Sequence, residues 1–297
     1  MTKKAGATPA FFGCFDSDIG EAGYNYRMLQ HEELNLRMTW AEQKARAAGE
    51  IMQRVAGSGK LGVRMKLDKT VVTDADKEVN DMVIASVSED FPQDGVLGEE
   101  ASANADRNLL WVCDPIDDTK GYLLGMTTAM FSLALCENGH PVVAVMYEPQ
   151  LDKMFVAVKG GGAFENGRPI HVSHQKTLEG AQIAFGPSFE QVMMRQKFYT
   201  SLVEAGVKLV PMSGEAFRGG MTANGIIDGH VFPGQGAHDV AAVQLIVEEA
   251  GGKVTDMRGD EQKYNAKIYG AIVSNGHLHN ELVNLLEKFG PDNFLGY

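Results

Sequence analysis

The chain has 297 residues, of which 44% are hydrophobic and 22% charged, and its formal net charge at pH 7 is −12. A chain of this length can bury one large core or two joined cores. The negative charge opposes binding to a nucleic acid polymer, whereas a small phosphorylated metabolite remains compatible if divalent cations neutralise some of the acids. No apolar run approaches the roughly 18 to 20 residues of a membrane span, and no secretory apolar core follows Met1, so we expect a cytoplasmic protein without a membrane partner.

The N-terminal third is predicted to be an arm followed by two helices. Residues 1–36 show no clear periodicity and are interpreted as an arm. Apolar residues recur at helical spacing from Leu36 to Val55 and again from Asp76 to Val87, ahead of the apolar segment Gly95–Leu97.

Strand-like runs follow, each bounded by turn residues, and they predict a mixed sheet: Leu109–Cys113, Met130–Cys136, Val142–Tyr147 and Met154–Lys159. After Ser173 helical and strand patterns alternate, which indicates a second lobe. Near its end, Asp239 is predicted to be the N-cap of an apolar helix that Gly251 terminates. The predicted organisation is therefore an arm (1–36), an α+β lobe (37–178) and an α/β lobe (179–297). Cys14, Cys113 and Cys136 have no close spacing and are expected to be free thiols.

The run Asp114-Pro115-Ile116-Asp117-Asp118-Thr119 places three carboxylates and a hydroxyl within six residues, directly after an apolar strand. Such oxygen ligands suit Mg²⁺. Pro115 has no backbone N–H, so we expect the chain to leave the strand there and to free the carboxylates and the Ile116 carbonyl to face one point. Taken alone, the run could equally be a solvated acidic turn.

Further acidic motifs stand at the ends of other elements. Their order along the chain resembles the inositol monophosphatase superfamily over roughly residues 40 to 285: Lys66-x-Asp68-x-Thr70-x-Val72-Thr73-x-Ala75-Asp76, then Gly98-Glu99-Glu100, then Asp114-Pro115-Ile116-Asp117-x-Thr119, then Asp239-x-Ala241-Ala242. The resemblance implies a layered α/β/α/β/α sandwich of the inositol monophosphatase and fructose-1,6-bisphosphatase type, with the active site between the two lobes. By the same analogy we expect a homodimer.

The resemblance also implies a Mg²⁺-dependent phosphoric monoester hydrolase in which water attacks the phosphorus directly. Glu99, Asp114 and the Ile116 carbonyl would hold one Mg²⁺. Asp114, Asp117 and Asp239 would hold a second, and a third, looser ion would sit near Glu99 and Asp68. Two or three Mg²⁺ per site are therefore expected.

The resemblance assigns catalysis to Thr119 and Asp68, which would together orient and deprotonate the attacking water. The backbone N–H groups of Asp118 and Thr119 would bind the phosphate. Thr73 and Asp76 are interpreted as loop and helix-cap residues, and Lys66 as either a solvated charge or an anchor for the Asp68 loop.

Two residues depart from the family pattern. Asp118 stands where glycine is usual, and its carboxylate could repel the phosphate, bind another cation or cap the following helix. Aspartate would tolerate a positive φ there better than most residues. His238 replaces the usual Trp beside Asp239, but the eight histidines show no pair at metal spacing, so a Zn²⁺ site is not expected.

The substrate is less closely defined. Phe232 stands where the inositol-specific branch has a Glu, which weakens inositol phosphate as a candidate substrate beside histidinol phosphate and 3′-phosphoadenosine 5′-phosphate. Ser213 and Glu215 lie in the segment that lines the substrate pocket in similar enzymes. Glu215 could hold a substrate hydroxyl or ammonium group there, or could lie on a solvent-exposed helix face. The alternative function is a catalytically degenerate metal-binding or regulatory member of the same family.

Overall fold

The structure is a computed structural model that describes residues 29–67, 70–186 and 193–294. Most of the predicted N-terminal arm, Cys14 and Asp68 therefore lie outside the described residues.

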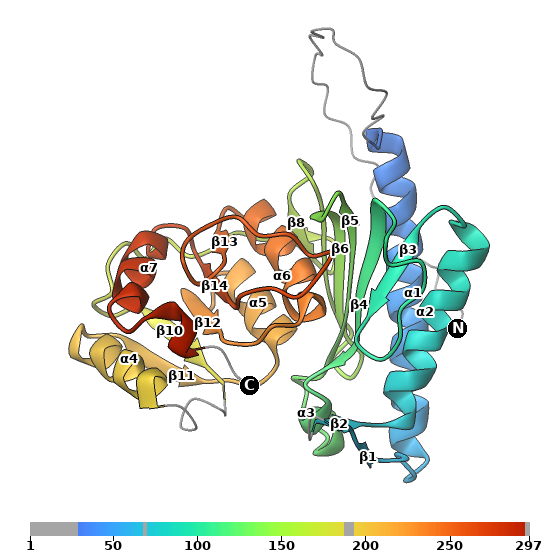
Figure 1. The fold of residues 1–297 in the computed structure, drawn as a ribbon, viewed down its shortest axis with the longest axis horizontal. Helices are drawn as coiled ribbons and strands as arrows, with labels where there is room; N and C mark the ends of the chain where they lie inside the picture. The colour runs from blue at the N-terminus through green and yellow to red at the C-terminus, as the bar shows by residue number, and fades with distance from the viewer. Residues whose placement is uncertain (1–28, 68–69, 187–192, 295–297) are drawn as a thin grey trace, which may run out of the picture.

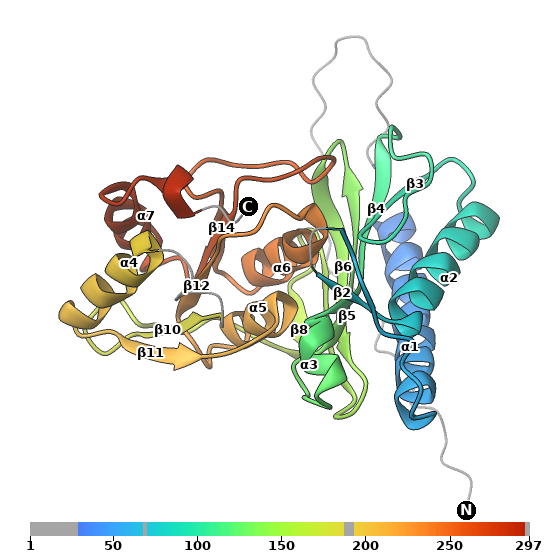
Figure 2. The same cartoon turned by 60° about the horizontal axis from the view of Figure 1, so that its bottom comes forward.

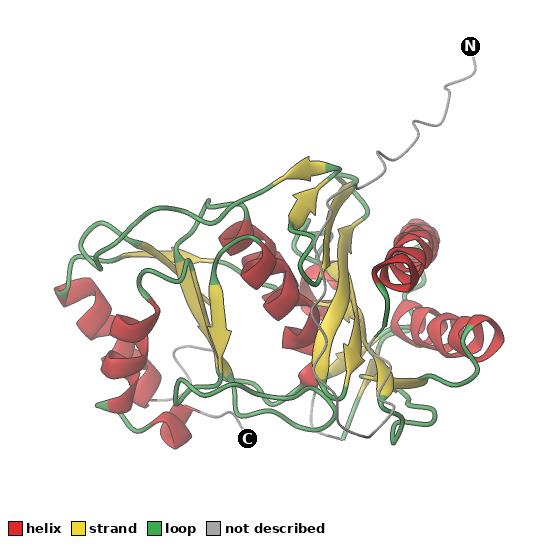
Figure 3. Ribbon diagram, turned by 90° about the horizontal axis from the view of Figure 1, so that it is seen from above, coloured by secondary structure: helices red, strands yellow, loops and turns green. Residues whose placement is uncertain are grey.

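Five layers are stacked in the order helix, sheet, helix, sheet, helix (Figures 1 and 3). One outer layer contains α1 (His31–Gly57) and α2 (Asp74–Asp90), and α5 (Glu215–Ala223) and α6 (Ala237–Glu249) lie between the sheets. The other outer layer contains α4 (Met193–Glu204), α7 (His279–Glu287) and the 3₁₀ turn η2 (Pro291–Phe294). This arrangement confirms the predicted α/β/α/β/α sandwich.

The first sheet has seven strands, and their spatial order follows the chain: β3 (Gly95–Gly98), β4 (Leu109–Asp117), β5 (Met130–Glu137), β6 (His140–Glu148), β7 (Lys153–Val158), β8 (Ala163–Glu165) and β9 (Arg168–Pro169). Only β3 and β4 are parallel, and every later pair is antiparallel. The sheet is therefore mixed, as predicted. A separate antiparallel ribbon, β1 (Arg64–Met65) and β2 (Val71–Val72), lies beside the short helix α3 (Thr119–Leu123; Figure 2).

The second sheet has five strands in the order β11 (Lys208–Pro211), β10 (Gln182–Phe185), β12 (Gly229–Phe232), β14 (Ala271–Ser274) and β13 (Lys253–Thr255). The strand β10 runs parallel to both neighbours, and β14 runs antiparallel to both of its own. The predicted lobe boundary at residues 178 and 179 falls in the segment that joins the two sheets.

Three apolar clusters hold the five layers together: one joins α1 and α2 to the first sheet, one surrounds α5 and α6 and reaches both sheets, and one joins the second sheet to α4 and α7. The central cluster contains α6, whose residues from Val240 to Val247 are all buried. A helix covered by sheets on both sides is apolar around its whole circumference, which explains its continuous hydrophobic sequence. This packing fixes the direction of α6 and places its first turn beside the C-terminal end of β4.

The structure corrects three local predictions. The strand β4 does not end before Pro115 but continues to Asp117. Helix α1 begins at His31, inside the predicted arm. Helix α6 begins at Ala237 with Gly236 as its N-cap, so Asp239 belongs to the first helical turn and the N-cap prediction was wrong. Gly251 follows the helix with a φ of 93°, as the predicted terminating glycine requires.

Cys113 and Cys136 are buried free thiols, as predicted. Among the described residues, none of the helices combines the length and the apolar character needed to cross a membrane.

Candidate active site

An irregularity in β4 brings Asp114 and Asp117 to the same side of the sheet. Asp114 pairs with Ser132 and Asp117 pairs with Met130, so two residues of β4 oppose only one residue of β5. In a regular strand, residues three apart point to opposite faces, and the additional residue of a bulge reverses that relation. Pro115, which has no N–H to offer the ladder, lies within the bulge. Pro115 was predicted to end the strand, but it instead lies in a bulge that turns the Asp117 side chain to the same face as Asp114.

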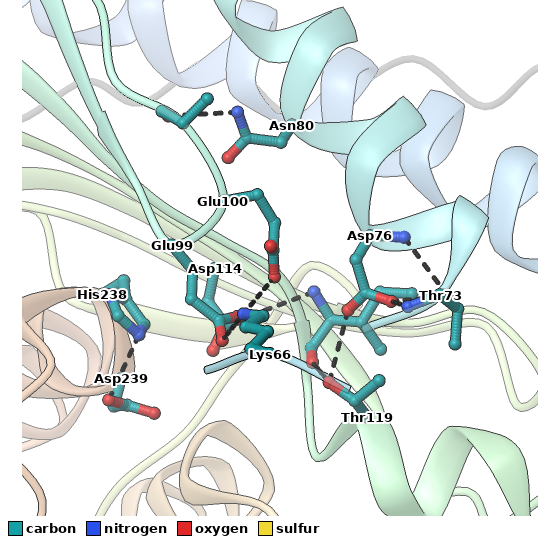
Figure 4. Close-up of polar contacts among 12 residues, drawn as sticks. Lys66, Thr73, Asp76, Asn80, Glu99, Glu100, Asp114, Thr119, His238 and Asp239 are labelled. Atoms are coloured by element: carbon teal, nitrogen blue, oxygen red, sulfur yellow. Dashed lines mark hydrogen bonds and ion pairs between the residues drawn. The ribbon is translucent and has the colours of Figure 1, made fainter. Parts of the chain in front are cut away.

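The first turn of α6 completes two groups of possible metal ligands. Asp114, Asp117 and Asp239 each place a carboxylate oxygen within 4.8 Å of the others, and Glu99, Asp114 and His238 do the same with one ligand atom each. The groups share Asp114. Figure 4 shows His238 and Asp239 approaching Glu99 and Asp114 from the helix side of the site.

The electrostatics of the aspartate group match a cation site. Burial, together with the neighbouring carboxylates, raises the pKa of Asp114 and of Asp239 well above the ordinary range. Burial and the Glu215 carboxylate raise the pKa of Asp117 to about 7, although two backbone N–H groups oppose the shift. Like charges held together out of water are unfavourable unless an ion or protons neutralise them. This donor set, with hard oxygen ligands and uncompensated charge, fits one or more divalent cations.

Lys66 is neither solvated nor distant from the site. Its ammonium group lies 2.8 Å from Glu99 Oε1 and 2.5 Å from Glu100 Oε1, and its side chain is only 20% exposed. The two glutamates follow the end of β3, so the strict alternation of a strand no longer separates their side chains. Lys66 therefore neutralises part of the carboxylate charge on the Glu99 side, and it places the β1–β2 ribbon against the cluster.

Thr119 contacts an aspartate that was predicted to be only a helix cap. Its hydroxyl lies 3.3 Å from Asp76 Oδ1 and 3.2 Å from the Ile116 carbonyl oxygen (Figure 4). Asp76 also caps α2, since its Oδ2 accepts the Thr73 N–H at 2.7 Å and Thr73 completes a capping box. The cap prediction was correct but incomplete. Asp76 already closes the first motif of the superfamily resemblance, and that position was the signal available in the sequence.

Asp118 adopts the left-handed conformation, with φ 64° and ψ 55°. Its carboxylate accepts the Gly121 N–H at 3.1 Å and the Thr128 hydroxyl at 2.7 Å, so it caps α3. Of the three roles considered for the Asp118 carboxylate, which were repelling the phosphate, binding another cation and capping the following helix, the structure shows the helix cap. The backbone tolerates aspartate because this residue type enters the left-handed region at modest cost.

The predicted substrate segment contains a closed ion-pair cluster. Glu215 Oε2 lies 2.6 Å from Arg218 Nη2 and Glu215 Oε1 lies 2.6 Å from His230 Nε2, and all three side chains are buried. The alternative of a solvent-exposed helix face was therefore wrong for Glu215. Burial alone would raise the pKa of Glu215, but His230 and Arg218 lower it below its ordinary value. A substrate group could reach this carboxylate only by displacing one of these partners.

The N-terminus of α5 connects this cluster to the metal-ligand groups. The backbone N–H groups of Glu215 and Ala216 donate to the two carboxylate oxygens of Asp117 at 3.1 and 2.9 Å. Gly214 precedes them with a φ of 78°, and a Cβ there would lie 2.7 Å from the Thr128 carbonyl oxygen, so the turn requires glycine. Ser213, the other predicted substrate residue, precedes Gly214 and is half-buried.

Comparison with known proteins gives one consistent result. A sequence model of the inositol monophosphatase family matches residues 35–290. The fructose-1,6-bisphosphatase/inositol-1-monophosphatase of Thermotoga maritima is 32% identical over 221 residues, which cover 74% of this chain and 84% of that protein. The histidinol-phosphatase of Mycobacterium tuberculosis is 31% identical over 266 residues, which cover 87% of this chain and 99% of that protein. The Nus factor SuhB of Xylella fastidiosa is 32% identical over 219 residues, which cover 72% of this chain and 80% of that protein.

Solved structures agree with these relatives. The Thermotoga maritima IMPase superposes with a TM-score of 0.75 at 29% identity, covering 85% of this chain and 97% of that one. The suhB protein of Bartonella henselae superposes with a TM-score of 0.77 at 29% identity, covering 85% and 99%.

Proposed function

The chain belongs to the inositol monophosphatase family of metal-dependent phosphatases, and from this premise we propose that it hydrolyses a small soluble phosphomonoester with two or three Mg²⁺ per site. The observation that carries the proposal is the pair of ligand groups that share Asp114. Glu99, Asp114 and the Ile116 carbonyl would hold one cation, and Asp114, Asp117 and Asp239 a second. When bound, such cations lower the pKa of water and neutralise charge on a phosphate ester.

Thr119 and Asp76 would supply the proton transfer. A Thr119 hydroxyl that donates to Asp76 Oδ1 leaves its oxygen lone pairs free to accept a proton from an attacking water. Burial raises the pKa of Asp76, which brings this carboxylate closer to the range in which it can accept a proton, although hydrogen bonds from Thr73 oppose the shift. The water then attacks phosphorus directly, without a covalent enzyme intermediate. This proposal gives Asp76 the part that the sequence assigned to Asp68.

The substrate is proposed to be a phosphate ester without an inositol ring. Phe232 is partly buried against the central apolar cluster and offers no acceptor for ring hydroxyls. Glu215, the nearby carboxylate, is held by Arg218 and His230. Histidinol phosphate is the first candidate because the relative of that activity aligns over 99% of its own length. 3′-Phosphoadenosine 5′-phosphate and inositol phosphate are the second and third candidate substrates. The cytoplasmic location and the homodimer remain predictions.

The substrate proposal is tested by phosphate release from histidinol phosphate, 3′-phosphoadenosine 5′-phosphate, inositol 1-phosphate and fructose 1,6-bisphosphate, with and without Mg²⁺. We expect one compound to dominate, with release abolished by Asp114→Asn and retained by Asp106→Asn, a substitution of an exposed aspartate. Release that persists in Asp114→Asn would contradict the assigned site. No release from any compound would favour the degenerate, regulatory alternative.

The proton-transfer assignment is tested by matched variants of Thr119 and the two aspartates. Loss of a general acid or base typically lowers the rate by about 10² to 10⁴, so we expect Thr119→Val and Asp76→Asn to lower kcat by about this factor. Thr119→Ser should retain most activity. A larger loss in Asp68→Asn than in Asp76→Asn would restore the assignment made from the sequence.

A further inference from the structure

His238 is the residue of the site that neither the proposed mechanism nor the substrate argument uses. It opens the first turn of α6 beside Asp239, and one of its ring nitrogens lies within 4.8 Å of a carboxylate oxygen of both Glu99 and Asp114. Three side chains, from the segment after β3, from β4 and from α6, are far apart in the sequence and meet at one point (Figure 4). No pattern in the sequence predicts this group, because the group contains a single histidine and metal sites with histidine are predicted from histidine pairs at fixed spacing.

The contacts of His238 leave the ring available to a ligand. Its single polar contact within the described ranges is an approach of Nε2 to Asp239 Oδ2 at 3.5 Å, longer than an ordinary hydrogen bond. The side chain is 22% exposed, so it lies at the wall of the site and not in the apolar core.

The backbone before α6 is shaped to fold this ring inward. A Cβ at Gly236 would lie 2.1 Å from Asp239 Oδ2 and 2.8 Å from His238 Nε2. Only glycine lets both side chains turn back over the start of the helix. Two consecutive residues therefore belong to different groups of possible metal ligands. Asp239 lies with Asp117, and His238 lies with Glu99.

We propose that His238 is a metal ligand and that, with Glu99 and Asp114, it forms a mixed nitrogen and oxygen site that prefers a first-row transition cation such as Mn²⁺ to Mg²⁺. The inference rests on the proposed function, which places a divalent cation between Glu99 and Asp114. Imidazole suits first-row transition cations such as Fe²⁺, Ni²⁺ and Zn²⁺, and Mn²⁺ can accept it beside the carboxylates that it shares with Mg²⁺, whereas Mg²⁺ strongly favours oxygen and gives up its waters reluctantly. One histidine in an otherwise carboxylate site therefore shifts selectivity without removing any oxygen ligand.

Lys66 does not block the site. It lies 2.8 Å from Glu99, but Glu100 offers it a second carboxylate at 2.5 Å. Glu99 can turn to a cation while Lys66 stays paired with Glu100. The neighbouring group, Asp114 with Asp117 and Asp239, contains oxygen ligands alone, so a cation bound there would have no nitrogen ligand.

The test is pulsed electron paramagnetic resonance of Mn²⁺ added to the metal-free full-length protein, with Mn²⁺ and Mg²⁺ affinities measured by calorimetry. We expect modulation from a directly bonded nitrogen in the wild type and in His277→Gln, an exposed histidine, and its loss in His238→Gln. The Kd for Mn²⁺ should rise at least about tenfold in His238→Gln while that for Mg²⁺ changes little, because the loss of a residue that only hydrogen-bonds to a metal ligand already costs about 10-fold to 100-fold in metal affinity.

Two results would overturn the inference in distinguishable ways. Bound Mn²⁺ that requires Asp114 but shows no nitrogen modulation would refute His238 as a ligand and leave the proposed phosphatase site intact. Mn²⁺ and Mg²⁺ binding that is absent, or indifferent to Asp114→Asn, would refute the metal site itself. The absence of nitrogen modulation is read from the wild-type spectrum, so the refutation of His238 as a ligand does not depend on the folding of His238→Gln.

Discussion

Two buried charged clusters lie side by side at the start of α5 and follow opposite electrostatic rules. The first consists of Asp114, Asp117 and Asp239, which are all acids. The second consists of Glu215, Arg218 and His230, in which one acid meets one cation and one imidazole donor. Burial penalises charge in both clusters, but only the second contains its own compensation.

The pKa shifts express this difference. Burial and repulsion raise the pKa values of the three aspartates, whereas the partners of Glu215 lower its pKa although its side chain is buried too. Charge is therefore neutralised within the Glu215 cluster, and it is left unneutralised in the aspartate cluster that we propose as cation ligands. This contrast in charge compensation separates the two clusters more clearly than burial does.

The largest expected effect is on the stability of the paired cluster. Arg218→Met leaves the Glu215 charge buried beside a lone imidazole, and breaking a buried pair in this way typically costs about 3–5 kcal/mol. We expect a correspondingly large fall in the free energy of unfolding, measured by urea denaturation. The control is Arg258→Met, which removes an exposed ion pair with Asp292 and should leave the unfolding midpoint unchanged. An equal loss in both variants would show that burial of the pair is unimportant.

Removal of a charge from the acidic cluster should raise the free energy of unfolding, whereas Arg218→Met lowers it. In metal-free protein, Asp114→Asn relieves repulsion, so we expect an increase in the free energy of unfolding of about 1 kcal/mol at pH 8. The same variant should lose the stabilisation that saturating Mg²⁺ gives to the wild type. A destabilised metal-free Asp114→Asn protein would mean that the aspartate is held by hydrogen bonds more than it is repelled.

The acidic cluster also predicts a pH dependence. The folded pKa of Asp117 is about 7 against an ordinary value of 3.8, so near neutral pH the folded state holds a proton that the unfolded state has released. Stability from this group is present at low pH and is lost as pH rises through about 7. At pH 6.5 a histidine of the unfolded chain is still about half protonated, so the histidines with lowered folded pKa values oppose the trend until about pH 7.5. The contribution of Asp117 is therefore measured as the difference between the wild type and Asp117→Asn.

We therefore expect the thermal midpoint of the metal-free wild type to fall relative to that of metal-free Asp117→Asn as the pH rises from about 5 to 7.5. Near neutral pH, Mg²⁺ should replace the proton and raise the wild-type midpoint. Differential scanning calorimetry with a chelator and with Mg²⁺ measures both effects. A wild-type midpoint that rises with pH relative to that of Asp117→Asn in the chelated samples would contradict the raised pKa.

The smallest effect is expected at Asp118, which stands beside the acidic cluster without joining it. Asp118→Gly keeps the positive φ and removes only the bonds from Gly121 and Thr128, and replacing a cap by glycine costs a few tenths of a kcal/mol. We expect kcat to change less than about threefold, since the carboxylate is turned into the cap. A large gain in phosphatase activity would instead indicate that Asp118 suppresses catalysis.

Much of the fold was readable in the sequence because local periodicity reports which face of an element is buried. The helices around Met52 and Val83 and the four central strands were predicted close to their observed bounds. The errors fell at termini. Helix α6 begins before Asp239 because tertiary packing, and not the nearest capping residue, decides where it starts.

The site divides in the same way. Short local motifs at the ends of elements were enough to predict four of the site residues, which are Asp114, Asp117, Thr119 and Asp239. The sequence alone determined which residue types were available for metal binding and phosphate chemistry.

Only the tertiary structure decided which of those residues meet. It paired Thr119 with Asp76, enclosed Glu215 between Arg218 and His230, and brought His238 to Glu99 across 139 positions. These contacts depend on the bulge in β4 and on the packing of α5 and α6 between two sheets, and long-range packing of this kind leaves no periodic trace in the sequence.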